Sequence, residues 1–168
     1  MITEGMFIEQ RRLETEAEPG TVYDVFSAIG GKRGWFYANW LWKLRGWLDR
    51  LIGGVGMSRG RTREGEAQPG DVVDGYTVDA MEPGRLLRLR NDLIAPGPAW
   101  MQFEALKSVH GKTLLVLTAF FEPHGLAGLA YWYALYPFHQ LVFNGMAREI
   151  IKRAEATMER DISLPASE

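Results

Sequence analysis

Three histidines and one carboxylate are the groups of this chain best suited to proton transfer. The histidines are His110, His124 and His139, and His139 lies within an apolar stretch. A histidine titrates near neutral pH, and its surroundings move its pKa readily. Glu122 could serve with His139 as an acid–base pair. Spacing alone does not show that the two side chains meet, and a hydrogen-bonded core histidine is the alternative interpretation.

The remaining sequence offers little other catalytic chemistry. There is no cysteine, which excludes disulfides, thiolate metal sites and cysteine nucleophiles. The sequence has neither a nucleophile elbow nor an HExxH motif, and its histidines are too scattered for a typical zinc site. We therefore expect no metal and no cofactor, and we assign no catalytic residue.

Aromatic residues make up 12% of the chain and include six tryptophans. Many of them gather in residues 34–54, where Trp35, Tyr37, Trp40 and Trp42 could line or roof an apolar pocket. The alternative is that these rings simply fill the core. With polar neighbours and one face of a later strand added, the predicted ligand-binding residues are Trp35, Tyr37, Asn39, Trp40, Met101, Phe103, Glu122 and His139.

The formal net charge is -2, which does not indicate a nucleic acid partner. Two groups of alternating arginines stand out, namely Arg59, Arg61 and Arg63, and Arg85, Arg88 and Arg90. They could meet an anionic head group. We favour a solvated sheet edge, where charge discourages aggregation between strands.

Residues 125–147 contain no Asp, Glu, Lys or Arg, which raises the question of a membrane span. Pro137, His139, Gln140 and Asn144 interrupt this segment, so we expect a buried or surface-lying helix instead. Its aromatic part, residues 126–136, fits either burial or an interface, including one between two copies of the chain. The N-terminus lacks the pattern of a signal peptide, and a chain without cysteine fits a reducing compartment, so we expect a cytoplasmic protein.

The first third of the chain predicts a strand and two helices. Residues 7–17 read as an edge strand, and residues 21–29 have apolar side chains at helical spacing. The segment 34–54 predicts the clearest helix, ended by glycines, with an apolar stripe of Tyr37, Trp40, Leu41, Leu44, Leu48 and Leu51.

From residue 58 the period changes to two. A polar strand is predicted over 58–64, followed by strands separated by short turns at 69–71, 82–84, 96–98 and 110–112. The regular turns favour an antiparallel meander. Residues 114–121 are apolar on both faces, so that strand should be central and covered twice.

The chain then becomes helical. Pro137 is compatible with the start of a new helix or with a kink. Beyond it a regular stripe is formed by Phe143, Ala147, Ile150, Ile151, Ala154 and Met158. We expect a single α+β domain over residues 1–160 and a flexible tail over 161–168.

Several distinctive motifs span nearly the whole chain. They include GWFYANWLW at 34–42, PGRLLRLR at 83–90, FEP at 121–123, YWYAL at 131–135 and PFH at 137–139. In these the chain resembles an uncharacterised bacterial domain family of the START-like, birch-pollen-allergen-like helix-grip superfamily, often called SRPBCC. The resemblance implies a curved antiparallel sheet wrapped around a long C-terminal helix, with two shorter helices between the first and second strands.

The resemblance also implies three functional hypotheses. The first is a binding module for a small apolar or amphipathic ligand in a cavity between sheet and helix. Because the family often follows an NAD(P)-binding, epimerase-like domain, the second is docking on such an oxidoreductase. No glycine-rich phosphate loop precedes Phe7, so either the protein stands alone or that domain is on another chain. The third is a cyclase- or dehydratase-like enzyme that uses Glu122 and His139.

Overall fold

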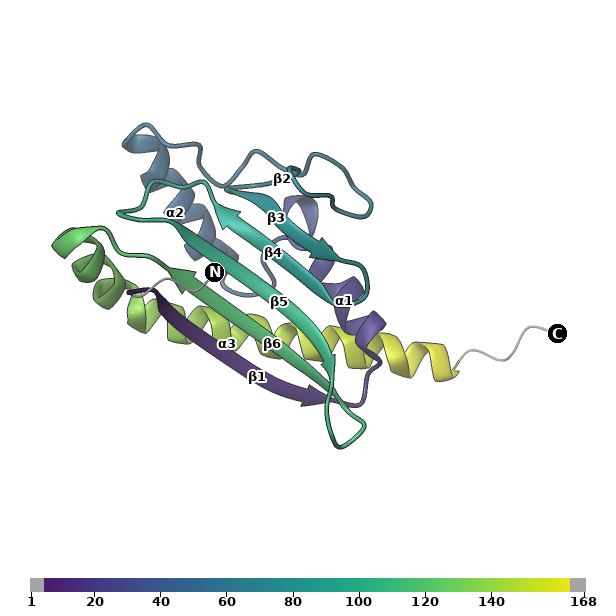
Figure 1. Ribbon diagram of the computed structural model, residues 1–168. Helices are drawn as coiled ribbons and strands as arrows, with labels where there is room; N and C mark the ends of the chain where they lie inside the picture. The colour runs from purple at the N-terminus through teal and green to yellow at the C-terminus, as the bar shows by residue number, and fades with distance from the viewer. Residues whose placement is uncertain (1–4, 164–168) are drawn as a thin grey trace.

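The computed structural model describes residues 5–163 of the chain (Figure 1). In chain order its elements are β1 (Phe7–Thr15), α1 (Pro19–Ser27), the 3-10 helix η1 (Gly31–Arg33), α2 (Asn39–Leu51), β2 (Val72–Val73), β3 (Tyr76–Glu82), β4 (Leu86–Asn91), β5 (Ala99–Lys107), β6 (Thr113–Phe121) and α3 (Gly125–Ser163). This order confirms the α+β helix-grip architecture, including the two helices between the first two strands.

The six strands form one curved antiparallel sheet in the order β1-β6-β5-β4-β3-β2. Strands β2 to β6 follow one another as the expected meander. The first strand, β1, returns to pair with β6 over its full length, with Phe7 opposite Phe121 and Thr15 opposite Thr113. The pairing places residues from both ends of the chain side by side, which matters for the site described below.

Strand β6 is paired on both sides but lies next to the edge strand β1 rather than at the centre of the sheet, and the expectation of two covering layers is wrong. Figure 1 shows the helices on one side of the sheet. On the other side β6 is shielded by long polar side chains of its neighbours. Gln10 donates to the hydroxyl of Thr118 at 3.0 Å, and Arg88 donates to Gln102 at 2.7 Å. The aliphatic stems of such side chains cover apolar surface while their heads stay polar.

The core lies between the inner face of the sheet and the second half of α3. The predicted stripe is confirmed, since Phe143, Ala147, Ile150, Ile151 and Ala154 are buried and Met158 is partly buried. Helix α1 packs on the same core through Val22 and Phe26. Pro137 lies inside α3, so no separate helix begins there.

The predicted boundary between the domain (1–160) and the tail (161–168) falls near the C-terminal end of α3. The helix continues to Ser163, so residues 161–163 are helical. Residues 1–4 of the predicted domain and residues 164–168 of the predicted tail lie outside the described residues.

Two sequence-based boundaries are corrected. The helix predicted from residue 34 begins only at Asn39, because Phe36 and Ala38 have positive φ angles of 65° and 51° that no helix accommodates. The polar strand predicted over 58–64 is reduced to a single bridge between Arg61 and Val73. Arg61 instead donates to the carbonyl oxygens of Ser27 and Ile29, and so closes the C-terminal end of α1.

The predicted membrane question has a direct structural answer. Among residues 5–163, no helix is both long enough and apolar enough to cross a bilayer.

Candidate functional site

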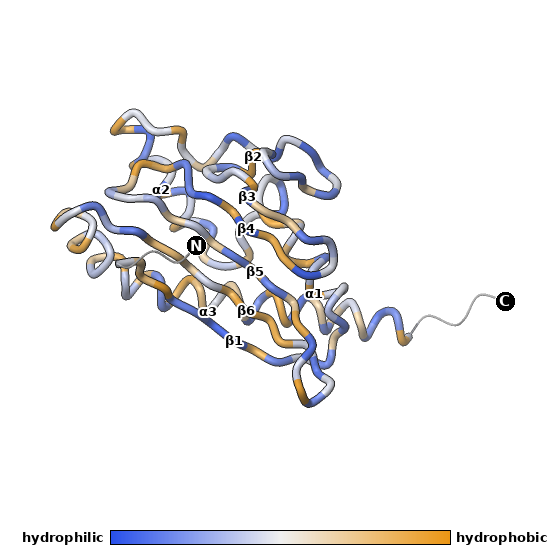
Figure 2. Tube along the Cα trace, viewed as in Figure 1, coloured by the Kyte–Doolittle hydropathy of each residue, from blue (hydrophilic) through white to orange (hydrophobic). Residues whose placement is uncertain are grey.

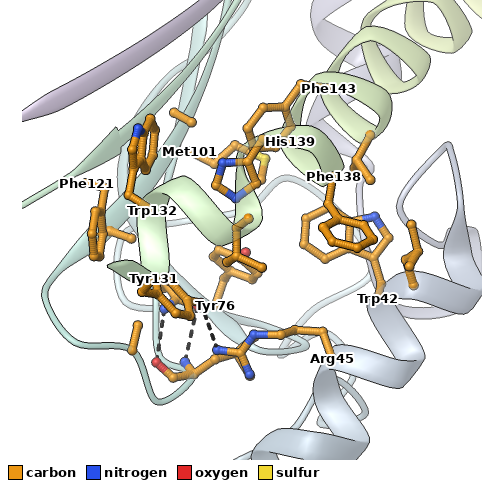
Figure 3. A pocket seen from close by; sticks show the side chains of 18 of the residues that line it. Trp42, Arg45, Tyr76, Met101, Phe121, Tyr131, Trp132, Phe138, His139 and Phe143 are labelled. Carbon is orange, nitrogen blue, oxygen red and sulfur yellow. Dashed lines mark hydrogen bonds between the residues drawn. The ribbon is translucent and has the colours of Figure 1, made fainter. Parts of the chain in front are cut away.

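A cavity of about 350 Å³ lies between the inner face of the sheet, α2 and the first half of α3 (Figure 3). Its walls come from all three parts of the fold. The lining residues are Leu41, Trp42, Leu44, Arg45 and Leu48 of α2; Tyr76, Asn91, Leu93 and Ala95; Ala99, Trp100, Met101, Ala119, Phe120 and Phe121 of β5 and β6; and Tyr131, Trp132, Leu135, Phe138, His139, Val142 and Phe143 of α3.

Small residues on the sheet create the space. Met101 of β5 is paired with Ala119 of β6, and Ala99 lies one step nearer the end of the sheet on the same face. Further along the same strands, Phe103 is paired with Leu117, and both are fully buried. The inner face therefore changes from tightly filled to hollow within two residues along each strand.

The α2 wall is held by an aromatic cluster. Trp42 lines the cavity and packs on Trp35, with ring centroids 4.7 Å apart, and Trp35 packs on Tyr76 at 4.8 Å. Trp35 is fixed from behind, because its indole N–H donates to Oδ2 of Asp74 at 2.9 Å. Burial raises the pKa of Tyr76, so its hydroxyl stays protonated at neutral pH.

Helix α2 is attached to the molecule by its polar side. Asp49 is fully buried and accepts the backbone N–H of Gly56 and of Ile94. Burial acts to raise the pKa of Asp49, but those two N–H groups together with Arg45 outweigh it and hold the pKa below its usual value. Gly46 approaches Met57 so closely that an added Cβ would lie 2.6 Å from it.

The opposite, apolar face of α2 therefore points to solvent. Its exposed side chains include Trp40, Leu44, Trp47, Leu48 and Leu51. Leu44 and Leu48 also line the cavity, so part of this exposed surface forms the cavity rim.

One wall of the cavity carries a polar pair, in which Glu9 is buried and His139 is partly buried. Figure 3 shows His139 pointing from α3 into the cavity beside Met101. Its ring is stacked on Phe143 and meets the edge of Trp132. Behind it, Nδ1 lies 3.6 Å from Oε2 of Glu9 on β1. Burial, aided by the positive charge of Arg11, lowers the pKa of His139 to about 4, so the imidazole is neutral at pH 7.

Glu9 is held by a network that joins β1 to α3. Figure 2 shows the hydrophilic character of β1, and among its side chains Glu9 is only 7% exposed. Its Oε1 accepts from Arg11 and from Nε2 of Gln140. Arg11 in turn donates to Oδ1 of Asn144 and Oε1 of Gln140, each at 2.7 Å. The other carboxylate oxygen of Glu9, Oε2, has no hydrogen-bond partner among the described residues.

The structure brings two of the eight predicted site residues to the cavity, Met101 and His139. Trp42, which the aromatic interpretation also placed there, does line it. Trp35 lies one layer behind the wall. Phe103 is at the filled end of the sheet, where it stacks on Phe26 with centroids 5.6 Å apart.

The other four predicted residues lie elsewhere, which corrects their expected placement. Trp40 is 64% exposed on the outer face of α2, and Oδ1 of Asn39 accepts the backbone N–H of Trp35 at the start of that helix. Tyr37 lines a second hollow of about 540 Å³ beside α3. Glu122 follows β6, and within residues 5–163 the carboxylate that approaches His139 is that of Glu9.

Sequence reasoning missed Glu9, Arg45 and the aromatic residues at the start of α3 as site residues. One signal for Glu9 was available. Glu9 and Leu13 are four residues apart on β1, so their side chains point to the same face of the sheet, and Leu13 packs against the core. The alternation therefore places a carboxylate on the inner face. Within the described residues, no cluster of three or more His, Asp or Glu side chains could hold a metal ion.

The fold and the cavity define a protein of the helix-grip class. The chain is similar to the di-domain aromatase/cyclase StfQ from the steffimycin biosynthetic pathway, with a TM-score of 0.57, 10% identity, and coverage of 92% of this chain and 52% of that one. It is similar to norcoclaurine synthase from Thalictrum flavum in complex with dopamine and hydroxybenzaldehyde, with a TM-score of 0.51, 12% identity, and coverage of 92% and 87%. It is also similar to the Zhui aromatase/cyclase from a Streptomyces species, with a TM-score of 0.51, 16% identity, and coverage of 89% of this chain and 94% of that one.

The family is more specific than the fold. Residues 2–146 match the family described as protein of unknown function (DUF2867), and the chain belongs to that family. No curated protein matches the chain significantly. The structural similarities are at low sequence identity, so they establish the fold alone.

Proposed function

We propose that this protein is a binding module for a small apolar or amphipathic molecule, held in the cavity between sheet, α2 and α3. The observation that carries this proposal is the cavity itself. Its volume of about 350 Å³ falls within the roughly 300–1,000 Å³ common for small-molecule sites. Most of its lining is apolar, with a few polar groups at defined places.

The chemistry of the walls selects the ligand class. Aromatic side chains from both helices, Trp42, Tyr131, Trp132 and Phe138, offer flat surfaces on which a ring or an acyl chain can pack. Burying such a surface contributes about 25 cal/mol for each Å² removed from water. The neutral imidazole of His139 supplies a hydrogen-bond acceptor on the inner wall, which suits a hydroxyl group of the ligand.

Known proteins of this fold support the same ligand class. Norcoclaurine synthase has been solved with two small aromatic compounds, and the aromatase/cyclases are named for reactions on small molecules. We propose by analogy that an aromatic or polycyclic compound is the preferred occupant, and that the protein acts in the cytoplasm. The proposal needs no metal and no cofactor.

A second candidate function is docking on a partner. It is favoured by the outward apolar face of α2, where Trp40, Trp47 and Leu51 are exposed. Tryptophan is enriched at the centre of protein interfaces. We propose two partners for this face, namely an NAD(P)-dependent oxidoreductase on another chain and a second copy of this chain. Light scattering of the purified protein tests the second of these, and a monomer at all concentrations would count against it.

The binding proposal is tested by native mass spectrometry and by a thermal-shift screen with fatty acids and aromatic compounds. We expect a co-purifying or added ligand to raise Tm, because binding to the folded state alone stabilises it. Ala119→Trp fills the cavity and should abolish the shift. Val109→Trp is the matched control, since Val109 is 96% exposed in a turn. A protein that carries no ligand and shows no shift with any compound would contradict the proposal.

A further inference from the structure

We infer that Glu9 and His139 make this cavity a proton-transfer site. His139 removes a proton from an apolar substrate whose C–H bond is acidified by a neighbouring carbonyl group, and Glu9 positions the imidazole. The inference rests on the proposed binding function and adds a reaction to it. It also replaces Glu122 by Glu9 as the acidic partner of His139.

The position of His139 is the first support. The side chain lies between the rings of Trp132 and Phe143, which fix its orientation, and it borders the cavity directly. Its Nδ1 is buried, and Nε2 is not among the buried unpartnered atoms of residues 5–163. No hydrogen bond of the described residues uses Nε2, which leaves that nitrogen available to a bound molecule.

The free oxygen of Glu9 is the second support. Oε2 of Glu9 and Nδ1 of His139 are both buried and lack a hydrogen-bond partner within residues 5–163, and they lie 3.6 Å apart. Leaving two such atoms unpaired is costly in a protein interior. The separation of 3.6 Å is longer than a hydrogen bond, as catalytic hydrogen bonds often are before substrate binds.

The network around Glu9 is the third support. Because Arg11 and Gln140 hold Oε1, the carboxylate is fixed with Oε2 turned toward His139. Asn144 fixes Arg11 from the other side. A carboxylate that accepts Nδ1–H sets the tautomer with Nε2 unprotonated, and this is the form that accepts a proton.

The reaction balances without a further reactant. Nε2 takes the proton from the substrate carbon, and the electron pair of the C–H bond moves to the carbonyl oxygen to give an enolate. The imidazolium that forms lies next to Glu9, whose negative charge opposes the burial that otherwise disfavours the charged ring. The proton returns to another atom of the same molecule or to water. Burial keeps His139 unprotonated before the reaction, with its pKa lowered to about 4, and the charged groups facing it among the described residues are Glu9 and Arg11 of β1.

The test uses a nitro-substituted benzisoxazole, a flat apolar compound that reports on a general base. Removal of its ring C–H proton breaks the N–O bond and releases a coloured phenolate. Positioned general bases contribute about 10²-fold to 10⁴-fold. We expect the wild-type protein to accelerate this elimination and His139→Gln to lose about 10²-fold of the rate. The control His124→Gln removes an exposed histidine and should leave the rate unchanged.

The positioning role of Glu9 is tested by measuring kcat and KM separately, because positioning should affect kcat alone. Glu9→Gln should lower kcat by about tenfold, less than the roughly 10²-fold contribution of the base itself, and leave KM close to wild type. A merely structural role would change stability and KM together. The wild-type rate should be constant across neutral pH and fall as the pH approaches about 4, where His139 becomes protonated. This profile needs no variant, and a rate that did not fall between pH 7 and pH 4 would contradict the inference even if His139→Gln does not fold.

Binding and reaction are separated by following tryptophan fluorescence, because Trp42 and Trp132 line the cavity. If the benzisoxazole quenches this fluorescence but no elimination occurs, or if His139→Gln is as fast as wild type, the proton-transfer inference is overturned and the binding function stands. If neither the benzisoxazole nor any compound of the thermal-shift screen binds, both fail.

Discussion

The two ends of the sheet's inner face differ sharply although they share the same strands. At one end Phe103 and Leu117 meet Phe26 and Ile150 in a core with every one of these side chains fully buried. At the other end Met101 and Ala119 face a cavity of about 350 Å³. One end uses large side chains to stabilise the fold, and the other leaves a cavity that we propose holds a ligand. Stability and the proposed function are thus separated along β5 and β6.

The largest effect is expected at the filled end. Phe103→Ala should lower the free energy of unfolding by about 3–5 kcal/mol, because it removes a fully buried ring and leaves a void. Chemical denaturation with urea measures this change. A loss below about 1 kcal/mol would show that this end is not the close-packed region described here.

The next effect comes from pH. His139 has a folded-state pKa of about 4, below the value of about 6.5 in an unfolded chain. Its contribution is therefore fully present above pH 6.5 and is lost as the pH falls toward 4, since the unfolded state then binds more protons. Wild type should lose stability by an amount on the order of 2 kcal/mol more than His139→Gln over this interval. Equal losses in both proteins, measured by urea titrations at several pH values, would contradict a buried neutral His139.

A matched pair of insertions compares the two ends directly. Ala105 and Ala119 are both buried alanines on the inner face, but Ala105 lies at the filled end. Ala105→Leu should cost about 1–3 kcal/mol through overpacking. Ala119→Leu should cost less than about 1 kcal/mol, since the added atoms enter the cavity, yet it should weaken ligand binding. Similar costs at both sites would remove the distinction.

The smallest effect is expected on the outer face of α2. Trp40→Ala should change stability by less than about 0.5 kcal/mol and leave ligand binding intact, because Trp40 is exposed. Trp42→Ala, only two residues away, removes part of the cavity wall and should impair binding. Isothermal titration of the two variants with the best ligand from the screen gives the comparison, and a larger binding loss for Trp40→Ala would reverse the assignment of the two faces.

Local sequence signals were sufficient for most of the fold. Short turns with proline and glycine defined the meander, and the apolar stripe of α3 matched the core that it now fills. The strand predicted over 58–64 is only a bridge, and the Arg61 side chain binds the carbonyl oxygens at the end of α1, a contact between distant segments that spacing does not reveal.

The site was harder to predict for two physical reasons. Helical periodicity identified the apolar face of α2 but not its direction, which is set by the buried Asp49 and the close approach of Gly46 to Met57. The pairing of Glu9 with His139 depends on β1 closing the sheet beside β6 and α3, so residues from opposite ends of the chain meet. No local pattern contains that information.

The most direct measurement is a crystal structure of the protein grown with a fluorescent naphthalene sulfonate, a probe with an apolar aromatic body. Binding in the cavity predicts electron density for the probe between Met101, Ala119 and His139. Density confined to the outer face of α2, with the cavity closed by its own side chains, would contradict the binding function on which the proton-transfer inference also depends.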